Sequence, residues 1–283
     1  MKPKHLFTLQ AHKGAITLVK INKNIIYASS TDGSISLTDI KEKEFKQRIS
    51  TQSPINSFIL DPFIVATDNS LLLYDLNFNV QASIVSKSSF TSLAFLQPYF
   101  ALAGCDDGSA RLVDSRSLIE LAILRGHSAP VLSVAASNTH FFTGGHDAKI
   151  IKWDQFGTAI QTMQVKSPVS GLVISKNNQF LLASTVGGGI WLINIQQSFQ
   201  LVKKWGAGGD KYLQNSLFFT INNSQKVICG SNNKVQFIDV KYGTIQEFED
   251  LDVENQAIFS CDCNGTHLVI GGESCRLGVY EFE

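Results

Sequence analysis

The chain has 283 residues, 44% of them hydrophobic, so it is long enough for one large domain or for two smaller ones. Lysine plus arginine and aspartate plus glutamate number 24 each, so the formal net charge is zero, and no basic run exceeds Lys203-Lys204. Nucleic-acid binding and binding to an anionic membrane surface both depend on excess positive charge, so neither is expected.

The N-terminal segment contains an apolar stretch, residues 5–10, that has the pattern of a strand. This stretch is too short and too polar for the hydrophobic region of a signal peptide, and no segment of the chain approaches the length of a membrane span. It precedes the repeats described next and has no repeat of its own. We therefore expect it to pair with the last repeat as an outer strand, which would tie down the N-terminus.

From residue 12 onward, the chain repeats a strand ending followed by a polar or acidic residue, at intervals of 36 to 45 residues. The seven pairs are Thr38-Asp39, Tyr74-Asp75, Val113-Asp114, Trp153-Asp154, Ile193-Asn194, Ile238-Asp239 and Tyr280-Glu281. Between them lie short runs rich in Val, Ile, Leu and Phe, separated by turn signals such as Asp32-Gly33 and Asp107-Gly108. This period is typical of a β-propeller built from four-stranded blades. We predict an all-β fold of seven antiparallel blades in a single domain, residues 1–283, because no linker or low-complexity segment divides the chain.

Two repeats share a second spacing. His12 precedes Asp32 by 20 residues and Asp39 by 27, and His127 stands at the same two distances from Asp147 and Asp154. The best-preserved repeat, GHSAPVLSVAASNTHFFTGGHDAKIIKWD at residues 126–154, resembles the WD-repeat family. The resemblance extends along the whole chain as strand rhythm, although only two repeats carry the histidine and only one carries Trp-Asp.

The resemblance implies a structural role for these residues. In the family, the histidine before the first strand of a blade bonds the aspartate of a later turn, and a hydroxyl and the tryptophan indole extend the network. Carried over, the network of the fourth repeat comprises His127, Asp147, Thr143 and Trp153, and the first repeat contributes His12 and Asp32. Buried polar groups need hydrogen-bond partners, so we interpret these residues as architecture and not as a catalytic triad.

No motif predicts catalysis, a metal or a cofactor. The glycine-rich segment at 206–210 lacks the Lys and Ser/Thr of a nucleotide-binding loop. Cys261, Cys263 and His267 lack further ligands at a suitable spacing for a metal. Five cysteines, an odd number, favour reduced thiols and hence an intracellular location, cytoplasmic or nuclear.

The propeller architecture directs attention to its loops. Residues just before the turn aspartates, Thr31, Asp106 and His146, are expected to point toward a partner on the rim. The long connection at 203–215 offers Trp205, Lys211 and Tyr212 as aromatic and cationic interface anchors. The alternative is that Trp205 ends an outer strand and packs on its blade.

Three functions remain open. The first is a non-catalytic scaffold or adaptor that binds proteins or peptides as a monomeric subunit of a hetero-complex. The second is a substrate receptor of a cullin-type ubiquitin ligase, whose motif ends a blade in Trp-Asp-x-Arg; here Val113-Asp114-Ser115-Arg116 keeps the Asp and the Arg. The third is a small-ligand binder or enzyme that uses the mouth of the propeller channel.

Overall fold

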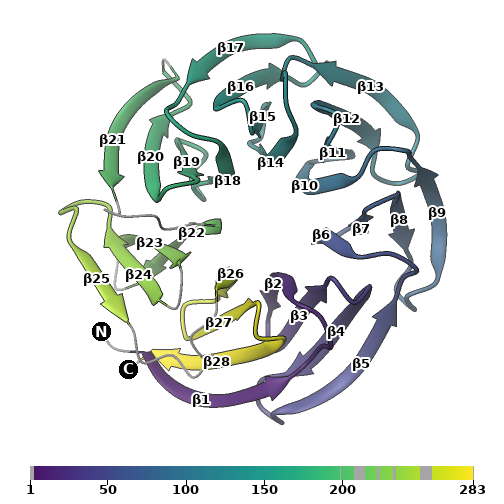
Figure 1. The fold of residues 1–283 in the computed structure, drawn as a ribbon, viewed down its shortest axis with the longest axis vertical. Helices are drawn as coiled ribbons and strands as arrows, with labels where there is room; N and C mark the ends of the chain where they lie inside the picture. The colour runs from purple at the N-terminus through teal and green to yellow at the C-terminus, as the bar shows by residue number, and fades with distance from the viewer. Residues whose placement is uncertain are drawn as a thin grey trace. The chain divides into compact units, whose positions relative to one another are not determined.

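The computed structural model describes residues 3–197, 199–206, 214–221, 224–231, 234–248 and 257–282. Within these ranges the chain is all-β, with strands β1 to β28 forming seven four-stranded antiparallel sheets (Figure 1). This is the seven-bladed β-propeller fold that the repeats predict. Contact density divides the chain into two compact units: residues 1–55 with 208–283, and residues 56–207. The single domain stays a prediction.

Blades 2 to 5 are numbered in chain order, and nearly all of their residues lie in the unit formed by residues 56–207. Blade 2 comprises β6 (Ile55–Leu60), β7 (Phe63–Thr67), β8 (Ser70–Tyr74) and β9 (Val80–Val85). Blade 3 comprises β10 (Phe90–Leu96), β11 (Phe100–Cys105), β12 (Ser109–Asp114) and β13 (Glu120–Arg125). Blade 4 comprises β14 (Val131–Ala136), β15 (His140–Gly145), β16 (Lys149–Asp154) and β17 (Ala159–Gln164). Blade 5 comprises β18 (Val169–Ile174), β19 (Phe180–Thr185), β20 (Gly189–Asn194) and β21 (Gln200–Gly206).

The other unit contains blades 1, 6 and 7. Blade 1 comprises β2 (Ile16–Asn22), β3 (Ile25–Ser30), β4 (Ser34–Asp39) and β5 (Glu44–Ser50). Blade 6 comprises β22 (Gln214–Ile221), β23 (Ser224–Ser231), β24 (Lys234–Asp239) and β25 (Ile245–Phe248). Blade 7 comprises β26 (Ile258–Cys263), β27 (His267–Gly272), β28 (Arg276–Phe282) and β1 (Pro3–Gln10).

The N-terminal strand completes the last blade, as the sequence predicts. β1 pairs antiparallel with β28 from Pro3, opposite Phe282, to Gln10, opposite Arg276, and Figure 1 shows the two strands side by side. Backbone hydrogen bonds between β1 and β28 therefore join the two ends of the chain within blade 7.

Burial explains the apolar character of the inner strands. All five residues of β7 are buried, whereas β9 and β17, both fourth strands, are mostly exposed. A strand covered on both faces requires apolar side chains at consecutive positions, and an outer strand does not. The turns between second and third strands use glycine in the left-handed region, with φ of 77° at Gly33 and 83° at Gly108.

Serine hydroxyls join neighbouring blades at their first strands. The backbone N–H of Leu93 donates to Ser57 Oγ, that of Leu172 to Ser133 Oγ, and that of Val19 to Ser260 Oγ, at 3.1, 2.8 and 3.1 Å. Each of these serines is buried. The hydroxyls satisfy backbone donors that would otherwise be buried without a partner, so these polar residues stabilise the stacking of apolar sheets.

In the part of the chain that the structure describes, no helix has the length and hydropathy needed to cross a membrane.

Candidate interaction surface

The polar network of blade 4 surrounds the side chain of His127. Its Nδ1 lies 2.8 Å from Asp147 Oδ1, and its Nε2 lies 2.8 Å from Thr143 Oγ1. The indole N–H of Trp153 donates to the same Thr143 oxygen at 2.9 Å. One protonation pattern satisfies every atom: Nδ1–H donates to the carboxylate, Thr143 O–H donates to Nε2, and the threonine oxygen accepts from the indole.

Glycine at position 145 makes this close contact possible. A Cβ at Gly145 would lie 2.4 Å from His127 Nδ1 and 2.5 Å from Asp147 Oδ1, distances that real side chains do not adopt. Gly126, which precedes the histidine, is similarly constrained, because a Cβ there would lie 2.9 Å from the ring of Trp153. The two glycines admit the imidazole and the indole between strands that are otherwise fully packed.

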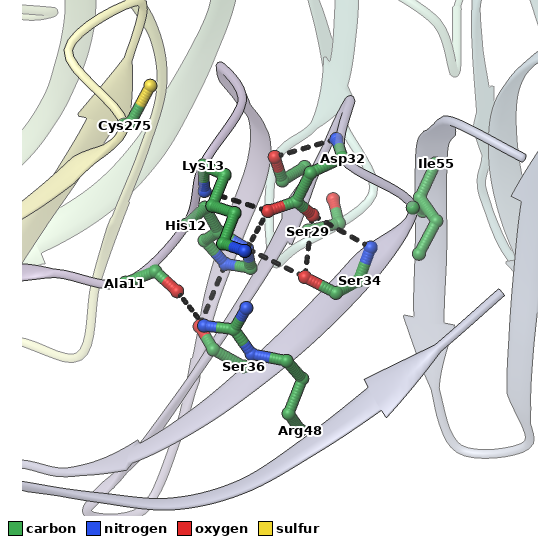
Figure 2. A network of polar contacts seen from close by, with 12 residues as sticks. Ala11, His12, Lys13, Ser29, Asp32, Ser34, Ser36, Arg48, Ile55 and Cys275 are labelled. Atoms are coloured by element: carbon green, nitrogen blue, oxygen red, sulfur yellow. Dashed lines mark hydrogen bonds and ion pairs between the residues drawn. The ribbon is translucent and has the colours of Figure 1, made fainter.

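In blade 1, the hydroxyls of two serines form the hydrogen bonds to the buried histidine (Figure 2). His12 Nδ1 lies 3.0 Å from Ser34 Oγ, and Nε2 lies 2.9 Å from Ser36 Oγ. The carboxylate of Asp32 is farther away, 3.5 Å from Nδ1, and it accepts the hydroxyl of Ser34 at 2.6 Å. The serine thus relays the contact between histidine and aspartate that is direct in blade 4.

The charges in this network follow from burial and hydrogen bonding. Burial lowers the pKa of His12, with the positive charge of Arg48 acting in the same direction, although Asp32 opposes the shift. Burial alone would raise the pKa of Asp32, but the hydroxyl of Ser34 and the N–H of Lys13 hold it at about 2. Near neutral pH the carboxylate is therefore ionised and the imidazole neutral, so all of their hydrogen-bonding capacity is used within the blade.

The turn aspartates also fix the segment that leads into each blade. Asp32 accepts the backbone N–H of Lys13 at 2.8 Å, and Asp147 accepts that of Ser128 at 3.1 Å. In blade 3, which has no histidine, Asp107 instead accepts the hydroxyls of Ser88 at 3.0 Å and Ser109 at 2.6 Å. These carboxylates therefore hold the loops of their own blades, which is a structural role.

The three residues expected on the rim have a common geometry. The backbone N–H groups of Thr31, Asp106 and His146 donate to the carbonyls of Ala15, Ser89 and Pro130, at 3.0, 3.0 and 2.8 Å. All three residues are exposed. The repeated bond anchors the backbone at the turn between second and third strands while leaving the side chain at the surface, where it can contact a partner.

Sequence reasoning missed two further positions of this kind because their turns lack aspartate. Val186 and Glu273 donate their backbone N–H groups to Pro168 and Ala257 at 2.9 and 3.0 Å. Both stand eight residues before the polar member of the strand-end pair, as Thr31, Asp106 and His146 do. Counting back from the strand end would have found them. These equivalent positions, each defined within its own blade, are referred to as the turn rim: Thr31 and Glu273 in one compact unit, and Asp106, His146 and Val186 in the other.

The long connection after blade 5 is described only in part. Trp205 lies in β21 opposite Ile190 and is 6% exposed, which matches the alternative in which the ring packs on its blade. Lys211 and Tyr212 lie outside the described residues, so their predicted interface role stays a prediction.

Arg116 lies at the other end of its blade from the turn rim. Its guanidinium donates to both carboxylate oxygens of Asp114, at 3.1 and 2.6 Å, and lies 3.9 Å from the ring centroid of Tyr99. These hydrogen bonds from Arg116 hold the pKa of Asp114 at about 2. The arginine side chain is 60% exposed, so a solvent-facing cation is held in one pose by an acid and an aromatic ring.

Two observations concern metal binding and thiol chemistry in the described residues. No group of three or more His, Cys, Asp or Glu side chains in the described ranges could hold a metal ion. Burial raises the pKa of the Cys105 thiol to about 11, so this cysteine is protonated and unreactive near neutral pH.

Comparison with known proteins supports the assignment of one blade directly. Residues 119–154 match the family described as "WD domain, G-beta repeat". A comparison with curated proteins finds no significant relative. The matched segment runs from the outer strand of blade 3 through Asp154 and includes the His127, Thr143, Asp147 and Trp153 network. Residues 119–154 are therefore similar to a WD repeat, and the chain that contains them folds as a seven-bladed β-propeller.

Proposed function

We propose that this protein is a non-catalytic scaffold or adaptor that binds protein partners through its turn rim, as a subunit of a larger intracellular complex. WD-repeat propellers in general bind protein partners, and that general role agrees with the matched repeat. The observation that carries the proposal is the geometry of the rim: one backbone hydrogen bond recurs in five blades, and the side chain beside it is at least partly exposed in each.

The hydrogen-bonded histidines and aspartates of the blades support binding through surface residues. The histidines and aspartates that could be mistaken for catalytic residues are saturated by partners within their own blades. Surface side chains at fixed backbone positions within a blade favour partner binding, because little ordering cost is then added on binding.

The test is a rim variant, Thr31→Ala with Asp106→Asn and His146→Ala, purified from native extract with its partners. Asp106→Asn removes the charge but keeps an oxygen for the N–H of Ser89. We expect a loss of bound partner of about tenfold or more with a melting temperature close to that of the unmodified chain. The matched control places changes in exposed residues of third-to-fourth-strand turns: Lys41→Ala, Asn77→Ala and Gln155→Ala. Equal recovery of partners by the two variants would contradict the use of the turn rim.

A second candidate function, substrate receptor of a cullin-type ubiquitin ligase, is favoured by the pose of Arg116. The repeat lacks the aromatic residue of the motif at Val113, but Tyr99 supplies an aromatic ring directly against the guanidinium. Co-purification with a cullin adaptor that is lost in Arg116→Ala and kept in Arg125→Ala, another exposed arginine of blade 3, would support it. An adaptor-free complex would leave the scaffold function alone.

A further inference from the structure

A cavity of about 350 Å³ lies between the N-terminal strand and the outer strands of blade 1. Its walls come from β1 and the residue after it, from the end of β4, and from β5. The lining residues are Leu9, Gln10, Ala11, Thr38, Phe45 and Arg48. All of them lie in one compact unit of the chain. The volume is at the lower end of the range of sites that bind small ligands or single side chains.

The corresponding place in blade 4 is filled by the protein itself. Thr38 and Trp153 occupy the same position, directly before the strand-end aspartate. Trp153 is 2% exposed and packs in a cluster with Leu124, which stands three residues before His127 as Leu9 stands three before His12. The cavity of blade 1 is therefore the space that a tryptophan occupies in its sister blade.

A second filler is also missing from blade 1. In three other blades, an apolar residue with positive φ lies in the turn between third and fourth strands and packs inward: Phe78 against Phe63, Leu118 in the cluster of Val113, and Phe199 stacked on Phe142. In blade 1 the left-handed position of this turn is Lys43, with φ of 56°, and it is exposed. Neither the strand end nor the turn supplies a large apolar group, so the space stays open.

The chemistry of the lining indicates what would fill it. Thr38 forms the floor at 1% exposure, and Phe45 stands at the mouth at 49% exposure. Arg48 donates to the carbonyl of Ala11, as Figure 2 shows, and its guanidinium lies 5.5 Å from the ring centroid of Phe45. Among the described residues, no carboxylate pairs with Arg48. An apolar cleft beside an arginine without an acidic partner complements an aromatic group next to a carboxylate.

We propose that this cavity docks an aromatic side chain from a protein partner, with an adjacent acidic group of the partner bound by Arg48. The proposal rests on the scaffold function and assigns it a second site, whose lining shares no residue with the turn rim. A large aromatic residue inserted in a pocket is the usual form of an interface hot spot. Blade 4 shows that this space in a blade accepts an aromatic ring, because Trp153 fills it there.

The first test uses 3-phenylpropionate as a probe on the full chain, with its amide as the uncharged control. We expect amide shifts in NMR at Leu9, Ala11 and Thr38, and weaker binding of the amide by several fold. Thr38→Phe, which fills the cavity, should weaken binding of the acid at least tenfold, whereas the isosteric Thr38→Val should weaken it by about twofold or less. Arg48→Gln should remove the difference in affinity between the acid and the amide. This variant tests the site if Thr38→Phe does not fold. Binding of the acid that Thr38→Phe leaves intact, or shifts confined to other blades, would overturn the proposal.

The second test compares partners recovered from native extract by the unmodified chain, Thr38→Phe and Thr38→Val. Loss of a defined partner with Thr38→Phe, together with its retention by Thr38→Val, supports the site. Partners fully retained by Thr38→Phe overturn the cavity while leaving the scaffold function standing. No partner with the unmodified chain counts against the scaffold function itself. If the chain self-associates and Thr38→Phe abolishes the self-association, the occupant of the cavity is a second copy of this chain and the proposal of a partner protein is wrong.

Discussion

Blades 1 and 4 begin from the same sequence spacing and differ in how they bury a histidine and an aspartate. In blade 4 the two groups touch at 2.8 Å, and in blade 1 they are 3.5 Å apart with Ser34 between them. The residue two positions before the aspartate explains the difference: Gly145 has no Cβ, whereas Ser30 has one in the same place. The contact distance is therefore set by a small residue outside the histidine–aspartate pair.

The source of the second hydroxyl also differs. Strand pairing places Thr143 opposite Ile151 in blade 4 and Ala28 opposite Ser36 in blade 1. The hydroxyl that contacts Nε2 has thus moved from the second strand to the third, with an apolar residue taking the vacated position. In blade 4 the same hydroxyl also accepts from Trp153, and without that indole blade 1 keeps an open cavity.

The largest expected effect concerns β1, which completes blade 7 and borders the cavity of blade 1. Deletion of residues 1–11 removes the outer strand of blade 7, together with Leu9 and Ala11, which line the cavity. We expect loss of soluble or folded protein, because β28 would then expose an unpaired edge. Soluble yield and thermal unfolding measure this, with removal of residues 1–2 alone as the control that leaves β1 intact. A deletion variant as stable as the full chain would contradict the expected requirement for the pairing of β1 with β28.

Removal of the indole from blade 4 should have the next largest effect. Trp153→Ala deletes a buried side chain of the kind whose loss costs about 3–5 kcal/mol, and it leaves the hydroxyl of Thr143 without its donor. Thr38→Ala, the matched change in blade 1, should cost about 1 kcal/mol or less, because its methyl group already borders a cavity. Urea unfolding of both variants gives the comparison. Equal losses of stability would show that the two positions are packed alike.

Exchange of the small residues would test the origin of the two contact distances. Gly145→Ser should destabilise the protein by about 1–3 kcal/mol, because its Cβ must displace the imidazole or the carboxylate. Ser30→Gly, the reverse change, should cost less, since it creates no clash and removes only the hydrogen bond that Ser30 Oγ accepts from the N–H of Asp32. Melting temperatures measure both, and Gly145→Ser without effect would mean that the glycine is not required.

Much of this comparison could be predicted from the sequence. The period of the strand ends predicted seven four-stranded blades and the pairing of the N-terminal strand, because strand rhythm and turn residues are local signals. The resemblance of residues 126–154 to the WD-repeat family implied the contact between His127 and Asp147 that the structure contains. These features depend on distances along the chain, which one sequence displays.

The rest depended on which side chains face each other across strands. Ser34 and Ser36 carry no mark in the sequence, and their role appears only when β4 is seen beside His12. The turns at Val186 and Glu273 carry no aspartate, so only the distance of these two residues from the strand end marks them in the sequence. The cavity at Thr38 is the absence of a side chain in three dimensions, which residue spacing does not reveal.

The smallest expected effect is a pH dependence that begins at His12. Its pKa in the folded chain is lowered by burial below the ordinary value of 6.5, so the unfolded chain binds the proton more readily. Stability should therefore be full above about pH 6.5 and should fall as the pH drops toward the lowered value, by at most about 1.4 kcal/mol per unit of difference. Asp32 adds nothing in this window, because its pKa of about 2 places its loss below pH 3.8.

A second histidine must be separated from this effect. Burial also lowers the pKa of His140, so the whole chain loses stability over the same window from two sites. Urea midpoints at pH 7.5 and pH 5.5 for the unmodified chain, His12→Gln and His140→Gln resolve them. We expect the difference between the two midpoints to shrink in both variants, and more in His12→Gln, because Ser36 donates to Nε2 only while the imidazole is neutral. An unchanged difference in His12→Gln would mean that the relay through Ser34 and Ser36 tolerates a charged imidazole, and the hydroxyls of blade 1 would then lose their assigned roles as donor and acceptor.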